Sequence, residues 1–461
     1  MGFGRWELKW VLMLLALVQG LTYAALVPPW QAPDEPRHFE VVRLVAAQGR
    51  VPSSLTVDPS LEQEIIASMR AAGYWRWGFS LVADFPEFPV TCFDEIYPEP
   101  AHQFYQPPLY YLLAATVLRL APDLSTLEQL YLLRGLSAVL LALAVLFADE
   151  AAAALFPTDM ALRTGMPAFV ALLPMAGFLG GAVTNDALVL PVEALLWWMS
   201  LLTLRDPSWR RAAGMLVAAL ALAFTKRTGL ASALTVFGMT AWLWLTRRKQ
   251  GIEDTGARTR RGGHWIGIWK LGVGLVIVVA LAVWQAWGRL EQYFHLPGEV
   301  GQFLRDGTYW QALGETPWLP WLGMLFQSFW ARFGWLNVPL PGLIYWIIGV
   351  ASLLALTGLL CQRGKWVSSI WGLPLFSAGF LLTLALILGK EILFLSYRAG
   401  VVPQGRYLFP VLIPIAMLYV LGWLSCVPSK HRRVAAAIMV LAMYTLNIYC
   451  LWGVIRPFYS Q

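Results

Sequence analysis

Residues 31–40 read QAPDEPRHFE, and they directly follow the first long apolar segment of the chain. Two adjacent carboxylates, Asp34 and Glu35, stand here between prolines. Proline fits the first turn of a helix because its missing N–H would have no partner there, so Pro36 predicts the start of a helix. The stretch is therefore the point where an apolar segment ends and a helix of different character begins, with two acidic groups at the junction.

The composition places the chain among membrane proteins. Its 461 residues are 58% hydrophobic and 13% charged, and the mean hydropathy is +0.59, whereas soluble proteins carry about 25% charged residues. A helix needs about 20 apolar residues to cross a bilayer. Segments close to this length lie at residues 10–28, 129–148, 166–183, 187–204, 211–225, 229–246, 267–288, 342–361, 366–389, 406–425 and 433–454. We predict an all-α polytopic membrane protein, one domain over residues 1–461 with about eleven transmembrane helices.

The first of these segments is interpreted as a retained helix. Its apolar stretch from Trp10 to Val27 is longer than the core of about 7–15 residues that is typical of a signal peptide. A cleaved signal peptide is the alternative, because Arg5 and Lys9 precede the segment and YAAL resembles a cleavage site.

Lysine and arginine gather in alternate connections. With the N-terminus inside the cell, most bases fall in short cytoplasmic segments, above all the loop at residues 247–265, as the positive-inside pattern requires. We predict a plasma (inner) membrane protein with a cytoplasmic N-terminus. The same pattern accounts for the formal net charge of +7 without a nucleic-acid partner. The four cysteines have no metal-like spacing and indicate neither a disulfide framework nor a zinc site.

Two long connections are predicted on the outer side. Residues 28–128 hold an amphipathic helix from Pro36 to Gln48 and a second helix that Ser60 and Gln63 would cap. Both helices are expected to lie in the membrane interface. Residues 289–341 are rich in tryptophan. These rings are interpreted as an aromatic belt at headgroup depth, and the alternative is a platform that stacks on a sugar or a lipid headgroup.

Five polar motifs fall on the outer side of this topology. They are APDEPRHFE after the first span, QPPLYYLLAA from Gln106, GAVTNDAL with Asn185 and Asp186, FTKRTGL with Lys226 and Arg227, and VVPQGRYLFP with Gln404, Arg406 and Tyr407. We therefore expect the active face of the protein on the outer side.

Three cations in these motifs depart from the charge pattern, because Lys226, Arg227 and Arg406 lie outside, where positive charge is normally avoided. Cations held in a cavity at the membrane surface suit a phosphate, which arginine grips through paired hydrogen bonds. Snorkelling to lipid headgroups is the alternative for each of them.

Asp34 is the first candidate for a proton acceptor. A carboxylate beside phosphate-binding cations could take a proton from an acceptor hydroxyl while a phosphate leaves. Helix capping is the alternative for Asp34 and also for Asp186, the second acidic candidate. Glu193 lies inside a predicted span, where an acidic residue is a functional candidate by default. Asp34, Glu35 and His38 are also residue types that could hold a divalent metal ion.

Several of these motifs resemble one group of enzymes. PDEPRHFEVVRLVAAQGRVP resembles the first outer loop of the GT-C superfamily, in particular the protein O-mannosyltransferases and the aminoarabinose-transferase-like enzymes, in which a DE pair carries the catalytic aspartate. QPPLYYLLAA and FTKRTGL are similar to the PPL-Y helix and the LTKG segment of that group. SFWARFGW and QGRYLFP resemble more closely a related bacterial family of multi-pass proteins of unknown function. Gln106 stands where the mannosyltransferases usually have histidine.

The resemblance implies an inverting glycosyltransferase that moves a sugar from a polyprenyl-phosphate donor in the lipid bilayer to an extracytoplasmic glycan, lipid or protein acceptor. It implies Asp34 as the base with Glu35 beside it, and Lys226, Arg227 and Arg406 as ligands of the donor phosphate. Supporting roles would fall to His38, Asn185, Asp186, Gln404 and Tyr407. Two alternatives stay open: a transporter or flippase of a lipid-linked sugar, although no internal repeat is seen, and a non-catalytic lipid-binding assembly subunit.

Overall fold

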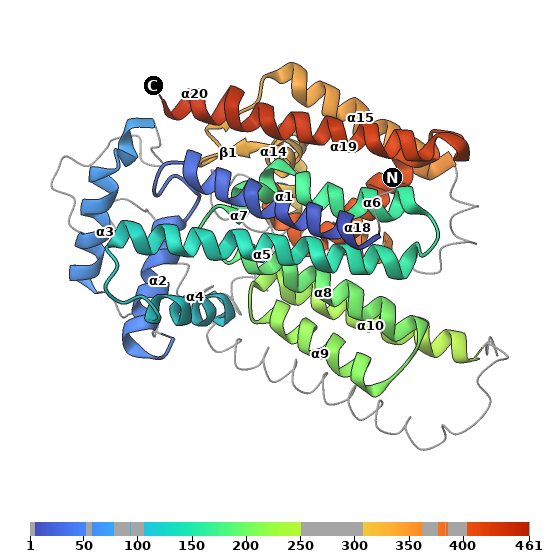
Figure 1. The fold of residues 1–461 in the computed structure, drawn as a ribbon, viewed down its shortest axis with the longest axis horizontal. Coiled ribbons are helices and arrows are strands. Elements are labelled where there is room, and N and C mark those ends of the chain that lie inside the picture. Colours follow the sequence, from blue (N-terminus) through green and yellow to red (C-terminus); the bar gives the residue numbers. More distant parts are fainter. Residues whose placement is uncertain are drawn as a thin grey trace.

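The computed structural model describes residues 5–51, 58–77, 93, 106–249, 308–361, 377–382, 384–385 and 403–460. This part is almost entirely helical (Figure 1). Six of its helical segments are long and apolar enough to cross a membrane: Leu8–Leu26, Thr126–Leu155, Asp186–Arg205, Gly342–Cys361, Gly405–Ser425 and Ser429–Tyr459. The predicted all-α polytopic membrane fold is confirmed.

Other predicted spans have different outcomes. Those at 211–225 and 229–246 form the helices α9 (Trp209–Ala223) and α10 (Arg227–Lys249). The span at 267–288, most of the one at 366–389 and most of the loop at 247–265 lie outside the described residues.

The spans pack along one another, with α5 (Thr126–Leu155) between α1 (Arg5–Leu26) and α8 (Asp186–Arg205) (Figure 1). On one side of this trio, α9 and α10 pack against α8 and against each other. On the other side lie three further helices, α6 (Met160–Leu172), α15 (Gly342–Cys361) and α19 (Arg432–Ile448), and α18 (Leu412–Ser425) packs on α8 as well as on this group. Among these, α18 packs on both α6 and α15, and α19 packs on α6.

The helix α6 and the following α7 (Pro174–Gly180) are bent by 54° and together form one further candidate span. Pro174 begins α7, and a residue before proline disfavours the helical conformation, so Leu173 is extended with ψ 118° and α6 ends there. Side chains of two other spans donate hydrogen bonds to the backbone carbonyls at the break. Asn447 donates to Leu172 O at 3.2 Å, and Gln19 donates to Leu173 O at 3.4 Å. The broken backbone is therefore satisfied inside the protein, as a lipid environment requires.

Shorter helices cover the end of the bundle that carries the polar motifs. They are α2 (Glu35–Gln48), α3 (Pro59–Ala71), η1 (Tyr74–Trp77) and α4 (Leu109–Arg119). The predicted cap of α3 by Ser60 is wrong. Pro59 takes the first helical position, and the Asp58 carboxylate before it accepts from the N–H groups of Ser60 and Leu61.

The tryptophan-rich segment lies partly in the core. It forms α13 (Thr308–Glu315), α14 (Trp318–Trp330) and a hairpin of β1 (Arg332–Phe333) with antiparallel β2 (Val338–Pro339). Trp330 is buried and packs edge-on against Phe169 of α6, whereas Trp310 is 64% exposed. The predicted aromatic belt can therefore apply only to exposed rings such as Trp310.

A short 3-10 helix, η4 (Gly405–Val411), carries Arg406. A Cβ at Gly405 would lie 2.1 Å from a backbone nitrogen of α14, so no larger residue fits there. The Gly405 N–H donates to Ser328 Oγ of α14 at 2.8 Å, and a serine of α10 donates to a carbonyl near the end of η4 at 2.6 Å. These contacts fix Arg406 between the two helices α14 and α10.

Candidate functional site

Asp34 stands between α1 and α2 in an uncommon backbone conformation. Its φ is +61°, in the left-handed region that few residues other than glycine adopt, although aspartate and asparagine tolerate it best. It occupies the N-cap position of α2, but its side chain accepts no hydrogen bond from the helix. Instead, Oδ2 accepts from Nη2 of Arg406 at 2.8 Å, and the side chain stays 29% exposed. The capping alternative is therefore wrong for Asp34.

Arg406 links two carboxylates. Its Nη1 lies 3.8 Å from Oδ2 of Asp186, and its Nε has no hydrogen-bond partner among the described residues. Asp186 is 1% exposed and forms a second ion pair with Lys226. Asp34, Arg406, Asp186 and Lys226 thus alternate in sign, and we call them the charged row. Its members come from four parts of the chain that lie far apart in the sequence.

Two further predicted residues border the charged row. The Tyr407 ring centre lies 5.6 Å from Nζ of Lys226 and 5.9 Å from the guanidinium carbon of Arg406, within the range of cation–π attraction. Arg227 is half-buried and begins α10, next to Lys226.

Asn185 and Gln404 form hydrogen bonds with backbone groups near the charged row. The Asn185 side chain donates to Thr225 O at 3.4 Å, which joins the turn before α8 to the turn before α10. Gln404 is half-buried at the start of η4, and its carbonyl accepts from the N–H of Tyr407 at 3.1 Å.

His38 lies one helical turn after Asp34 and is 4% exposed. Its Nδ1 is 2.8 Å from the hydroxyl of Tyr111 on α4, and the two rings stack with centroids 5.9 Å apart. Burial lowers the pKa of His38 to about 4 although the Asp34 charge opposes this, so the imidazole is neutral at pH 7. Sequence reasoning did not select Tyr111 as a site residue. The available signal was its place in the QPPLYYLLAA motif.

The carboxyl of Asp34 is held in its charged form. Burial raises its pKa, but the positive charge of Arg406 and the hydrogen bond from it, together with the charge of Lys226, outweigh burial. The pKa therefore lies below the ordinary value of 3.8. The result is an ionised, partly exposed carboxylate that is tied to a cation.

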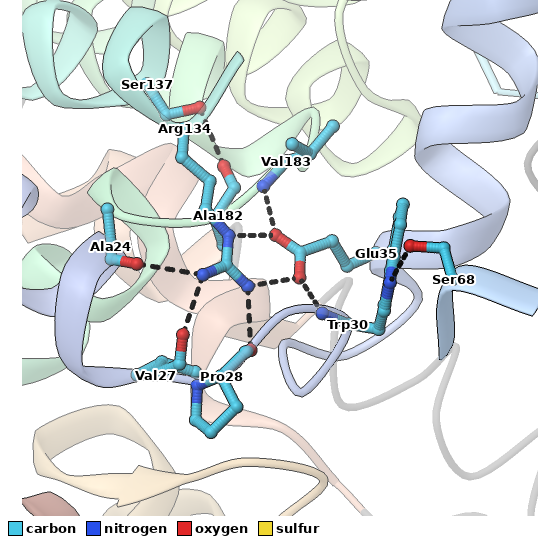
Figure 2. A network of polar contacts seen from close by, with 10 residues as sticks. All are labelled: Ala24, Val27, Pro28, Trp30, Glu35, Ser68, Arg134, Ser137, Ala182 and Val183. Atoms are coloured by element: carbon cyan, nitrogen blue, oxygen red, sulfur yellow. Dashed lines mark hydrogen bonds and ion pairs between the residues drawn. The ribbon is translucent and has the colours of Figure 1, made fainter. Parts of the chain in front are cut away.

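Glu35 follows Asp34 in the sequence but belongs to a different network (Figure 2). Arg134 of α5 donates to its two oxygens from Nε at 2.9 Å and from Nη2 at 2.6 Å. The N–H of Val183 donates to Oε1 at 2.9 Å, and that of Trp30 donates to Oε2 at 3.1 Å. Both ion-paired side chains are 0% exposed. We call this pair the Glu35–Arg134 clamp.

The clamp also closes the end of α1. Arg134 donates to the carbonyls of Ala24 at 2.9 Å, Val27 at 2.7 Å and Pro28 at 3.0 Å. The last carbonyls of a helix have no partner within the helix. One buried guanidinium therefore satisfies the helix end and the Glu35 carboxylate together.

This placement does not fit the predicted catalytic role of Glu35 beside Asp34, because both oxygens of Glu35 are occupied and no part of it is exposed. It does not fit a metal site either. Asp34, Glu35 and His38 direct their polar atoms to three different partners. In the described ranges, no three His, Cys, Asp or Glu side chains gather where they could hold a metal ion.

The clamp instead fixes the charged row. Glu35 adjoins Asp34, and its partner Val183 lies three residues before Asp186. One carboxylate thus holds together the two segments that carry the carboxylates of the row.

Glu193 is a second buried fixing point. It is 0% exposed, and its Oε1 accepts from the N–H of Ile413 at the start of α18 at 3.1 Å. Asp186 precedes Glu193 by seven residues, and Arg406 precedes Ile413 by seven. The helix α8 therefore meets the η4–α18 unit at two points that lie two helical turns apart.

Comparisons with known proteins bear on the family and the fold. A family model described as "Predicted membrane protein (DUF2142)" matches residues 98–416, more than half of the chain. No curated protein sequence matches. The solved structure of ArnT from Cupriavidus metallidurans bound to undecaprenyl phosphate is 14% identical with a TM-score of 0.44, over 98% of this chain and 73% of that one. The Archaeoglobus fulgidus oligosaccharyltransferase in complex with zinc and sulfate is 14% identical with a TM-score of 0.41, over 95% of this chain and 53% of that one.

Proposed function

The chain belongs to the DUF2142 family of predicted membrane proteins, and we propose that it is a GT-C-type glycosyltransferase that moves a sugar from a polyprenyl-phosphate donor to an extracytoplasmic acceptor. The charged row is the observation that carries the proposal. A partly exposed carboxylate, Asp34, stands beside the buried cations Arg406 and Lys226 at one end of the bundle. Those are the two kinds of group that phosphate departure and proton transfer need.

In this proposal the three cations bind the donor phosphate. Arg406 presents two parallel donors to two phosphate oxygens, and Lys226 and Arg227 add positive charge. As the sugar leaves, negative charge grows on the phosphate, and fixed cations stabilise that charge without having to reorganise.

Asp34 accepts the proton of an acceptor hydroxyl. The acceptor oxygen attacks the anomeric carbon, the bond from that carbon to the phosphate oxygen breaks, and polyprenyl phosphate leaves with the electron pair. A single displacement of this kind inverts the anomeric configuration. A positioned base contributes a factor of about 10²–10⁴ to such a reaction. The clamp and Glu193 hold these groups in place, and no step is assigned to a metal ion.

The proposed site faces the extracytoplasmic side of the plasma membrane. The opposite end of the bundle carries the ion pairs of Lys9 with Glu150 and of Arg432 with Asp159. Basic residues concentrate on the cytoplasmic side of membrane proteins, which supports a cytoplasmic N-terminus.

The test is sugar transfer by purified protein in lipid bilayers, with polyprenyl-phosphate sugars as donors and a melting curve for each variant. Asp34→Asn removes the proton acceptor, and we expect transfer to fall at least ~100-fold while the melting curve shows that the variant is folded at the assay temperature. Asp159→Asn is the matched control, because Asp159 caps α6 at the far end of the bundle and asparagine caps equally well.

Each alternative has its own outcome. Full transfer by Asp34→Asn would remove the proposed base. Movement of lipid-linked sugar across the bilayer without transfer by the wild type would indicate a flippase. Donor binding with neither transfer nor movement would indicate an assembly subunit.

A further inference from the structure

We propose that Arg406 pairs with two anions in succession. Without donor it forms an ion pair with the Asp34 carboxylate. When the donor phosphate binds, Arg406 pairs with the phosphate instead, and the Asp34 carboxylate is released. The inference rests on the proposed function, because it concerns how the same site becomes competent.

Asp34 is held by a single side chain of the described ranges and is partly exposed. Its one hydrogen bond from a side chain in the described part comes from Nη2 of Arg406 at 2.8 Å. The Asp34 side chain is 29% exposed and that of Arg406 is 10% exposed. A ligand can therefore reach this pair from outside. The Nε of Arg406 is buried and has no partner among the described residues, so the guanidinium does not use its full hydrogen-bonding capacity when it is paired with Asp34.

The unequal burial of the two carboxylates decides which one gives way. Asp186 is 1% exposed and keeps a second ion pair with Lys226. Asp34 lacks a second ion pair within 4 Å in the described part and sits at the exposed end of the row. A phosphate and a carboxylate repel each other on the same guanidinium face, so the phosphate displaces the carboxylate that can turn toward solvent, which is the 29% exposed Asp34 and not the buried Asp186.

Release changes what Asp34 can do. Paired with Arg406, it is a poor proton acceptor because the cation stabilises its charged form. Once the phosphate neutralises that cation, the affinity of the carboxylate for a proton rises. The acceptor hydroxyl then meets a competent base only when the donor is bound.

The test is a binding cycle with undecaprenyl phosphate on the full-length protein in nanodiscs. Asp34→Asn removes the competing anion, and asparagine tolerates the left-handed backbone as aspartate does. We expect it to bind undecaprenyl phosphate about tenfold more tightly than the wild type, the order of one charge-assisted hydrogen bond. In an Arg406→Gln background the gain should shrink to less than about twofold, because the shared cation is gone.

Lys226→Gln is the matched control background, since Lys226 pairs with Asp186. There the gain from Asp34→Asn should persist. An equal gain in the Arg406→Gln and Lys226→Gln backgrounds would mean simple repulsion between Asp34 and phosphate, and it would overturn the inference, as would no gain at all. Melting curves verify that each variant is folded, and Arg406→Ala, which also removes the shared cation, replaces Arg406→Gln if the latter does not fold.

The same cycle separates the two proposals. If the wild type does not bind undecaprenyl phosphate, the proposed donor site fails, and the inference fails with it. If the wild type binds and transfers sugar but the cycle shows no dependence on Arg406, the proposed function stands and the inference alone is wrong.

Discussion

Replacing Glu35 with glutamine removes the negative charge of the clamp and keeps the size of the side chain. The glutamine oxygen can still accept from the Val183 N–H, but its amide hydrogens then face two other donors, the Trp30 N–H and the Arg134 guanidinium. Arg134 stays 0% exposed without a counter-charge. Loss of one partner from a buried ion pair costs about 3–5 kcal/mol. Because Arg134 keeps three backbone carbonyls as acceptors, we expect a loss of about 3 kcal/mol, at the lower end of that range.

Equilibrium unfolding of the purified protein in mixed micelles measures this loss. Glu64→Gln is the matched control, since Glu64 pairs with Arg43 at 3.1 Å but is 44% exposed. An exposed ion pair contributes about 0–1 kcal/mol, so the two variants should differ by about 2 kcal/mol or more. Equal unfolding free energies for Glu35→Gln and Glu64→Gln would refute the view that the clamp holds this end of the bundle together.

Three further predictions concern pH, the donor site and topology. Burial and the nearby Glu62 raise the pKa of Glu40 from 4.5 to about 7, although Arg37 opposes this. Between these two pH values the folded state binds more protons than the unfolded state. The free energy of unfolding should therefore fall as pH rises from about 4.5 to 7 and level off above that. Unfolding midpoints between pH 5 and 8 should show this decline in the wild type and a flatter profile in Glu40→Gln, and the same slope in both would contradict it. Arg406→Ala should lower the affinity for undecaprenyl phosphate about tenfold to a hundredfold. Arg406→Lys should recover only part of this loss, because lysine cannot present two parallel donors. Equal titrations of wild type and Arg406→Ala would exclude this residue from the site. Thr255, which lies outside the described residues, is predicted to be cytoplasmic. Thr255→Cys in intact cells should therefore react with an impermeant thiol reagent no more than the wild type does, and labelling above the wild-type level would reverse the predicted orientation.

The sequence predicts the fold class well because lipid imposes a simple pattern on it. Long apolar segments and the side on which lysine and arginine collect are enough to place the polar motifs at one end. The charged row follows from the same logic. The sequence motifs single out Asp34, Asp186, Lys226 and Arg406, and the structure brings these four side chains together as one row.

The different roles of the adjacent residues Asp34 and Glu35 could not be predicted from the sequence. Asp34 and Glu35 are chemically similar and adjacent, yet a left-handed backbone at Asp34 sends their side chains to different networks. The partners that decide the matter, Arg134 and Arg406, lie about a hundred and about 370 residues along the chain, so no local pattern reveals them. The clamp and the contact of Glu193 with Ile413 are tertiary in the same sense.

The left-handed backbone at Asp34 has a consequence for any mutational scan of this protein. Glycine and asparagine accept that conformation, while most other residues would lose about 1–2 kcal/mol to steric contact with the following carbonyl, and β-branched ones more. Inactive variants at this position would therefore mix two causes, a misplaced chain and a missing carboxylate. A scan scored on activity alone would rank the position as intolerant even if the carboxylate had no chemical role. Only the ratio of activity to folded abundance, read at asparagine and glycine, isolates the contribution of the acid.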